Sequence, residues 1–150
     1  MGKAIARSRI ERLVEGVADL SLSGTLTNLY KTFTVTADKT IAGEDTGTWF
    51  VIGATGKTIT LPAAEGNRGV HFYFLNGMAS TPNVILVGGS PWIGNITSGT
   101  GTAISGNGSN KTLTGTSIAL GEYIHVVSGG TYWHIIDHNV KANDGWAFST

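Results

Sequence analysis

Residues 31–138 are dominated by short runs of β-branched and aromatic residues, and this pattern limits the possible folds more than any other feature. Gly, Pro and Asn separate the runs at intervals that are typical of sandwiches and barrels. We therefore predict an all-β domain, a compact barrel or sandwich of about eight short antiparallel strands. The predicted strands lie within KTFTVTA, TWFVIG, KTITLP, VHFYFLN, NVILVG, TLTGTSIAL, EYIHVVS and TYWHIID.

One connection in this region, in the stretch VIGATGKTITLP, looks like a phosphate-binding P-loop. A P-loop needs a Gly five positions before the second Gly, and that position is Val51. It also needs a helix after the loop, whereas Lys57 to Pro62 alternates polar and apolar residues and so predicts a strand. We interpret Gly53 and Gly56 as the turn of a β-hairpin.

Two further connections carry many glycines. Ser128, Gly129 and Gly130 fit the tight turn of a second hairpin. The segment from Gly94 to Thr116 contains six Gly and a single charge. An unstructured loop of that length is unusual in a compact domain, and the sequence leaves open whether the segment is strand or loop.

The first 30 residues differ from the β region, and we interpret residues 1–30 as an N-terminal arm with a short helix and an extended segment. Ser8 and Glu11 fit a capping box at the start of that helix. An isolated helix of about three turns is marginal and needs a surface on which to pack. We predict that the arm docks on a larger protein surface through Lys3, Arg7, Arg9, Ile10, Arg12, Leu13, Val14 and Val17. Residues 139–150 are predicted to be a C-terminal tail.

The composition narrows the class of function. Charged residues make up 13% of the chain and their formal charges cancel, against about 25% charged residues in ordinary soluble domains. A neutral chain has no overall field that would attract nucleic acid or an anionic membrane, and four clustered cations without interleaved aromatics are a poor match to nucleic acid. No apolar run approaches the roughly 20 residues of a membrane span. We expect a non-catalytic protein without a cofactor.

Candidate sites for metal binding and catalysis are weak. His134 and His138 would share one face of a strand, but there is no Cys, and Asp137 would point to the other face. We therefore expect no metal site, although His71 or His125 could supply a distant third ligand. The carboxylates considered for glycoside hydrolysis are Glu44, Asp45, Glu65 and Glu122, and no pair among them stands out.

Tryptophan side chains suggest an alternative, a glycan-binding module. Trp92 follows Ser90-Pro91 at the end of a strand and could face solvent. Trp133 lies in an alternating strand, where it could equally belong to the core. Under this alternative, Trp92 and Trp133 would stack on sugar rings.

Residues 32–77 carry a set of motifs that occurs in known proteins. These are the strand with VTA, Asp45-x-Gly47 before an apolar strand, a Gly turn into ITLPA, and a Gly-led aromatic strand. Together with the closing hairpin GEYIHVVSGGTYWHII, they resemble a small β-domain of tailed-bacteriophage structural proteins, most closely head decoration (cement) proteins.

The resemblance spans about 31–138 and implies a non-catalytic virion protein, a homotrimer with a β-barrel or sandwich body. It implies binding to the major capsid protein on the surface of the phage head, with assembly in the host cytoplasm. A trimer would multiply the weak affinity of a single arm. The alternative within the same resemblance is a receptor- or glycan-binding module of the tail-fibre type.

Overall fold

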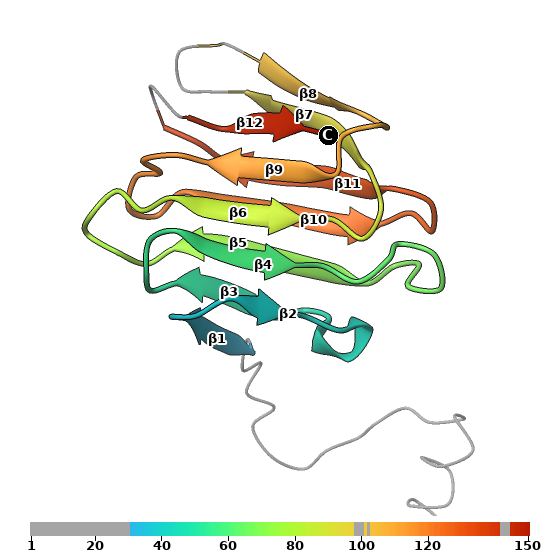
Figure 1. Ribbon diagram of the computed structural model, residues 1–150, viewed down its shortest axis with the longest axis horizontal. Helices are drawn as coiled ribbons and strands as arrows, with labels where there is room; N and C mark the ends of the chain where they lie inside the picture. Colours follow the sequence, from blue (N-terminus) through green and yellow to red (C-terminus); the bar gives the residue numbers. More distant parts are fainter. Residues whose placement is uncertain (1–30, 98–100, 102, 142–144) are drawn as a thin grey trace, which may run out of the picture.

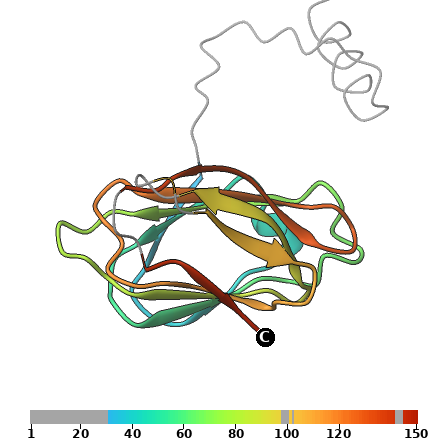
Figure 2. The ribbon, with the colours of Figure 1, turned by 90° about the horizontal axis from the view of Figure 1, so that it is seen from above.

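The computed structural model describes residues 31–97, 101, 103–141 and 145–150. In this part of the chain, two β-sheets pack face to face as a sandwich (Figures 1 and 2). The one helical segment described is a 3-10 turn, η1, at Gly43–Asp45. The prediction of an all-β fold is confirmed.

The sandwich contains a seven-stranded and a five-stranded sheet. In spatial order the seven-stranded sheet contains β1 (Thr32–Val35), β3 (Trp49–Ile52), β5 (His71–Asn76), β10 (Tyr123–Ser128), β11 (Trp133–Asn139), β7 (Trp92–Thr97) and β8 (Ala103–Asn107). The five-stranded sheet contains β12 (Ala147–Ser149), β9 (Thr112–Gly115), β6 (Val84–Val87), β4 (Lys57–Thr60) and β2 (Lys39–Thr40).

Strands β1 to β6 form the coiled half of the sandwich. Odd-numbered strands of this half lie in the seven-stranded sheet and even-numbered strands lie in the five-stranded sheet. The pairs β1–β3, β3–β5, β2–β4 and β4–β6 are all parallel. The chain therefore winds around the core, crossing from one sheet to the other after each strand (Figure 1).

This winding corrects the prediction of a hairpin at Gly53 and Gly56. A strand does follow the turn, as predicted, but β3 and β4 belong to different sheets. Ile52 and Ile59 are both buried because each points into the core from its own sheet. The Gly56 N–H donates to Asn83 O of the next crossing at 2.8 Å, so the turn is an arch that stacks on its neighbour.

Strands β7 to β12 form the antiparallel half. The pairs β7–β8, β10–β11 and β9–β12 are antiparallel, as are the pairs that join this half to the coiled half, β5–β10 and β6–β9. Among the described strands of this half, only β7 and β11 pair in parallel. The prediction of an antiparallel domain is thus correct for this half and wrong for the coiled half.

The turn between β10 and β11 is the hairpin predicted at Ser128–Gly130. Ser128 pairs with Trp133, and the Gly129 N–H donates to Tyr132 O at 3.0 Å. Gly130 has a φ of +96°, a conformation that residues with a side chain rarely adopt.

All eight predicted runs contain a strand, and four further strands complete the sheets. The glycine-rich segment from Gly94 to Thr116 contributes most of β7 and all of β8 and β9. The tail is also part of the body, because β12 pairs with β9 and both Val140 and Trp146 are buried. The predicted boundary after residue 138 is therefore wrong.

The core fills the space between the sheets. Inward positions alternate along the central strands, so that β5 and β10 each bury every second residue. The largest fully buried side chains are Trp92, Trp133, Phe50 and Phe72. Fully burying side chains of this size stabilises the fold by roughly 1.5–3 kcal/mol each.

Buried polar side chains hold the turns at one end of the sandwich. Ser128 Oγ donates to Ala64 O at 2.9 Å, and Ser90 Oγ accepts the Ala64 N–H at 2.9 Å. Both bonds reach across more than 20 residues of sequence and connect the two halves at the turn after β4. Ser90 thus satisfies the Ala64 N–H, and Ser128 adds a second bond to Ala64 O, which also accepts the Asn67 N–H at 3.0 Å.

Candidate functional site

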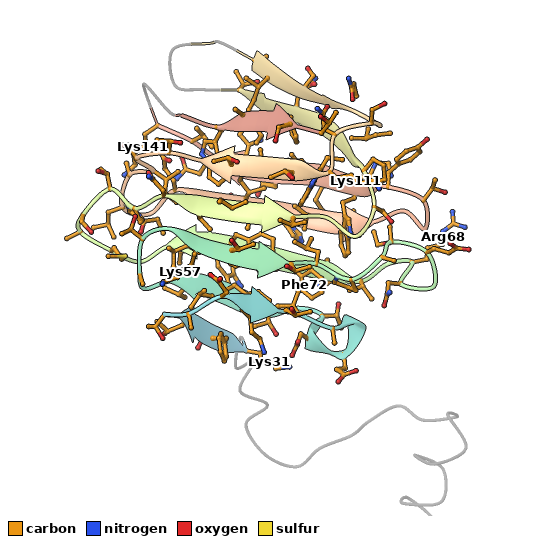
Figure 3. The ribbon with its side chains drawn as sticks, viewed as in Figure 1. Lys31, Lys57, Arg68, Phe72, Lys111 and Lys141 are labelled. Atoms are coloured by element: carbon orange, nitrogen blue, oxygen red, sulfur yellow. The ribbon has the colours of Figure 1, made fainter. Side chains whose placement is uncertain are left out.

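The arm residues predicted to bind a capsid lie outside the described residues. This applies to Lys3, Arg7, Arg9, Ile10, Arg12, Leu13, Val14 and Val17. The six remaining basic residues of the chain lie between Lys31 and Lys141, and the five of them that Figure 3 labels are spread around the sandwich.

Trp92 and Trp133 cannot stack on a sugar ring, which corrects the glycan-binding prediction for these two residues. Both side chains are 0% exposed. Their indole N–H groups donate inside the protein, from Trp92 to Lys111 O and from Trp133 to Pro62 O, each at 3.0 Å. The strand alternation places both rings on the inner face of the seven-stranded sheet.

The carboxylates considered for hydrolysis are Glu44, Asp45, Glu65 and Glu122. Asp45 accepts the Ala42 N–H at 3.1 Å and the Lys31 ammonium at 3.2 Å. The Ala42 N–H is the main cause that lowers the pKa of Asp45, so this carboxylate stays ionised at neutral pH and cannot donate a proton. Glu122 is buried and accepts the Lys141 N–H at 2.8 Å, while Glu65 is exposed in a turn. These contacts do not single out an acid–base pair.

A β-bulge changes the predicted placement of His134 and His138. The pairing of β10 with β11 shifts by one residue between His125 and Val126, so Ile136 has no opposite residue. One extra residue inverts the alternation of side chains beyond it. His134 lies opposite the outward Val127, and His138 lies opposite the buried Ile124, so the two imidazoles do not share a face.

The same bulge brings Asp137 to the outer face of the seven-stranded sheet, opposite His125. The prediction that Asp137 lies on the other face from His134 and His138 is therefore wrong for His134, which shares the outer face with Asp137, and holds for His138. The Tyr123 hydroxyl donates to Asp137 Oδ2 at 2.7 Å. This hydrogen bond is the main cause that lowers the pKa of Asp137, and it raises the pKa of Tyr123.

A continuous row of side chains crosses four strands on this outer face. Trp49 of β3 pairs with Tyr73 of β5, Tyr73 pairs with His125 of β10, and His125 pairs with Asp137 of β11. The three rings stack along the row, with centroids 4.3 Å apart for Trp49 and Tyr73 and 3.8 Å apart for Tyr73 and His125. We call these three residues the outer stack.

The geometry of the outer stack limits what it can bind. Trp49 and Tyr73 are parallel to within 3°, and Tyr73 and His125 to within 19°. Both faces of the Tyr73 ring are therefore covered by neighbouring rings. A sugar ring stacks on an open aromatic face, so Tyr73 offers it only an edge.

A pair of imidazoles adjoins the outer stack. His71 Nδ1 lies 3.0 Å from His125 Nε2, and the two rings come from neighbouring strands, β5 and β10. The contact is a hydrogen bond in which the tautomers decide which nitrogen donates. Burial is the main cause that lowers the pKa of His125, and His71 lowers it further, whereas Asp137 raises it.

The sequence pattern did not predict the outer stack. The aromatic residues that it favoured for binding, Trp92 and Trp133, are buried. The sequence did contain one signal for these residues. Trp49, Tyr73 and His125 each alternate with buried residues along their strands, and this alternation predicts the outer face for all three. Their meeting in one row depends on the pairing register, which the sequence of each strand does not contain.

No helix among the described residues is long and apolar enough to cross a membrane. No three His, Asp or Glu side chains among the described residues gather closely enough to hold a metal ion.

No protein-family model, curated protein or solved structure matches this chain.

Proposed function

We propose that the chain is a non-catalytic structural protein of a tailed-bacteriophage virion, which decorates the assembled head as a homotrimer and stabilises it. The observation that carries this proposal is a contrast within the chain. The buried side chains between Val35 and Trp146 form one continuous core, whereas the basic, amphipathic residues 1–30 precede the first strand of the sandwich. The proposal assigns the apolar residues of the arm to the contact with the partner.

The motifs of the phage resemblance also contact one another, which supports the proposal. The ITLPA motif includes the end of β4 and the turn after it, and the closing hairpin includes β10 and β11. Trp133 Nε1 of the hairpin donates to Pro62 O of the motif at 3.0 Å, and Ser128 Oγ donates to Ala64 O at 2.9 Å. Two of the recurring motifs, ITLPA and the closing hairpin, thus contribute to the contact between the two halves.

In the proposed mechanism, the arm anchors the protein and the sandwich remains on the surface of the shell. The apolar face of the arm packs between capsid subunits, and its four cations pair with capsid carboxylates. Three arms in one trimer bind with a higher effective concentration than a single arm. A protein that binds only the assembled shell stabilises that shell by mass action.

The first experiment locates the protein on virions by cryo-electron microscopy or with a gold-labelled antibody. The proposal expects density over the head at the symmetry of the capsid lattice. Density confined to the tail would contradict head decoration and support the tail receptor-binding alternative. A virion without label would contradict both.

A second experiment tests the arm by removing residues 1–20. We expect head binding in co-sedimentation to be lost, while the circular dichroism spectrum and melting temperature of the sandwich, whose first described strand begins at Thr32, are retained. A matched control reverses a charge on the sandwich instead, with Lys57→Glu, and should still bind. Retained binding of the truncated chain would contradict the anchoring role.

A further inference from the structure

We propose that copies of this chain associate through the outer face of the seven-stranded sheet. The inference rests on the proposed function for the number of copies, three, whereas the choice of the face rests on the described residues. Two neighbouring rows of outward side chains cross this face from β1 to β11. One row contains the outer stack, and the other lies two residues further along each strand.

Each row is aromatic or apolar in its middle and polar at both ends. In the first row, the outer stack lies between Thr32 of β1 and Asp137 of β11. The second row consists of Thr34, Val51, Leu75, Tyr123 and Asn139. An apolar centre with a polar rim, in which Trp and Tyr are frequent, is typical of a protein–protein interface. The described face has this composition.

The outer face of the five-stranded sheet provides the contrast. One of its rows consists of Thr40, Thr60, Val87, Thr112 and Ser149, and the next contains Thr58, Ile85, Thr114 and Ala147. No aromatic side chain belongs to these two rows. Because Ser is depleted and Tyr and Trp are enriched at interfaces, the face of the seven-stranded sheet is the better match.

Charge and size both fit a second copy of the chain as the partner. Asp137 is the only Asp, Glu, Lys or Arg in the seven strands as described, and its carboxylate accepts the Tyr123 hydroxyl. The chain has a formal net charge of +0, so its copies do not repel one another through net charge. Seven strands about 4.8 Å apart and about 20 Å long make a face of roughly 600 Å². This is close to the roughly 800 Å² that each partner contributes to a stable interface.

The two ends of the rows are complementary in a three-fold arrangement. Contacts around a three-fold axis are heterologous, so the β1 side of one copy meets the β11 side of the next. The hydroxyl donors of Thr32 and Thr34 then meet the side-chain acceptors of Asp137 and Asn139. The aromatic and apolar middle of each face turns toward the axis.

The test measures the mass of the untagged full chain by sedimentation velocity and light scattering over a range of concentrations. We expect a particle of three times the chain mass of 15.6 kDa. Leu75→Lys places a charge in the middle of the second row and should lower the association affinity at least tenfold. Ile85→Lys is the matched control, since Ile85 is a half-buried aliphatic residue on the opposite face, and it should change the affinity less than twofold. Circular dichroism and melting temperatures check that both variants fold.

Hydroxyl-radical footprinting of the original chain tests the same face without a substitution. We expect Leu75 and Tyr123 to be protected at concentrations above the dissociation constant, while Ile85 reacts equally above and below it. Association that Leu75→Lys leaves unchanged, or protection at Ile85 instead, would overturn the inference. A chain that binds the phage head as a monomer would also overturn it and would leave head decoration intact. A dimer that Leu75→Lys dissociates would support the interface and contradict only the number of copies.

Discussion

The coiled half and the antiparallel half of the sandwich use similar strands but connect them in different ways. In the coiled half, short arches send the chain from one sheet to the other, and like strands stack in parallel. In the antiparallel half, the hairpins β7–β8 and β10–β11 return the chain within the same sheet. A strand pattern in the sequence thus predicts a strand in both halves, but it does not predict the partner of that strand.

The two halves share one core in spite of this difference. Trp133 of the antiparallel half packs against Phe72 of the coiled half with centroids 5.5 Å apart and bonds to Pro62 O. The strand pairs β5–β10 and β6–β9 join the halves in both sheets. We therefore expect the halves to unfold together, and the predictions below test this from the largest effect to the smallest.

Replacing Trp133 with Ala should have the largest effect. It removes a fully buried indole that contacts both halves, and we expect a loss of about 3–5 kcal/mol in the free energy of unfolding. Guanidinium unfolding followed by circular dichroism should show one transition at a lower midpoint. Ile136→Ala in the same strand, where the side chain is 55% exposed, should cost at most about 0.5 kcal/mol. Two transitions, one of them unchanged, would show that the halves are independent.

Gly89 lies in the connection from β6 to β7, where the chain passes from the coiled half to the antiparallel half. A Cβ at this position would lie 2.7 Å from Ala63 N and 2.8 Å from Pro62 C, and backbone atoms cannot easily move away. We expect Gly89→Ala to cost about 2–3 kcal/mol of stability in denaturant unfolding.

Gly56→Ala is the comparison for Gly89→Ala. Gly56 has a φ of +70° but open space around it, so its replacement should cost only about 1 kcal/mol. Equal losses of stability for the two variants would contradict the argument that the close backbone contact at Gly89 excludes a side chain.

Tyr73 tests the outer stack, which also crosses from one half to the other. Trp49 and Tyr73 belong to the coiled half and His125 to the antiparallel half. Tyr73→Ala should lower stability by about 1–1.5 kcal/mol, since it removes two cross-strand ring contacts. Tyr73→Phe keeps both contacts and should stay within about 0.5 kcal/mol of the original chain. A larger loss for Phe than for Ala would show that the hydroxyl, and not the stack, is important.

The pH dependence of stability should give the smallest effect. Burial and His71 lower the pKa of His125, so the unfolded chain takes up a proton there more readily than the folded chain. The resulting stability is present above about pH 6.5, the usual imidazole value, and is lost as the pH falls below it. Tyr73 and Asp137 also face this ring, and Asp137 opposes the shift. The melting temperature should therefore fall from pH 7 to 5, and it should fall less in His125→Phe.

Local sequence patterns predicted much of the fold. Period-2 alternation with Gly and Pro boundaries located eight of the strands, and the glycines at 129 and 130 marked a true hairpin. Four strands were missed because their signals are weak: β2 has two residues, β12 has three, and glycines interrupt β7 and β8. The glycine in β7, Gly94, has a φ of +121° and packs against Ile135, so the fold requires it there.

The candidate site was less predictable than the fold. The prediction that Trp92 and Trp133 stack on sugar rings was wrong, because an aromatic residue in an alternating strand can belong to the core as well as to the surface. The face of His138 and Asp137 could not be predicted either, since a one-residue bulge in β11 inverts the alternation. The His71–His125 contact joins residues 54 positions apart and needs both the pairing and the register of β5 and β10.

The sequence by itself determined that this chain forms short strands, where most of them lie, and which side of each strand is apolar. These properties depend on neighbouring residues, through backbone preferences and the alternation of side chains. The tertiary structure alone decided whether a turn is an arch or a hairpin, which strands are adjacent, and in which register. Those choices depend on how whole strands pack across the core, and they are what brings Trp49, Tyr73, His125 and His71 together on one face.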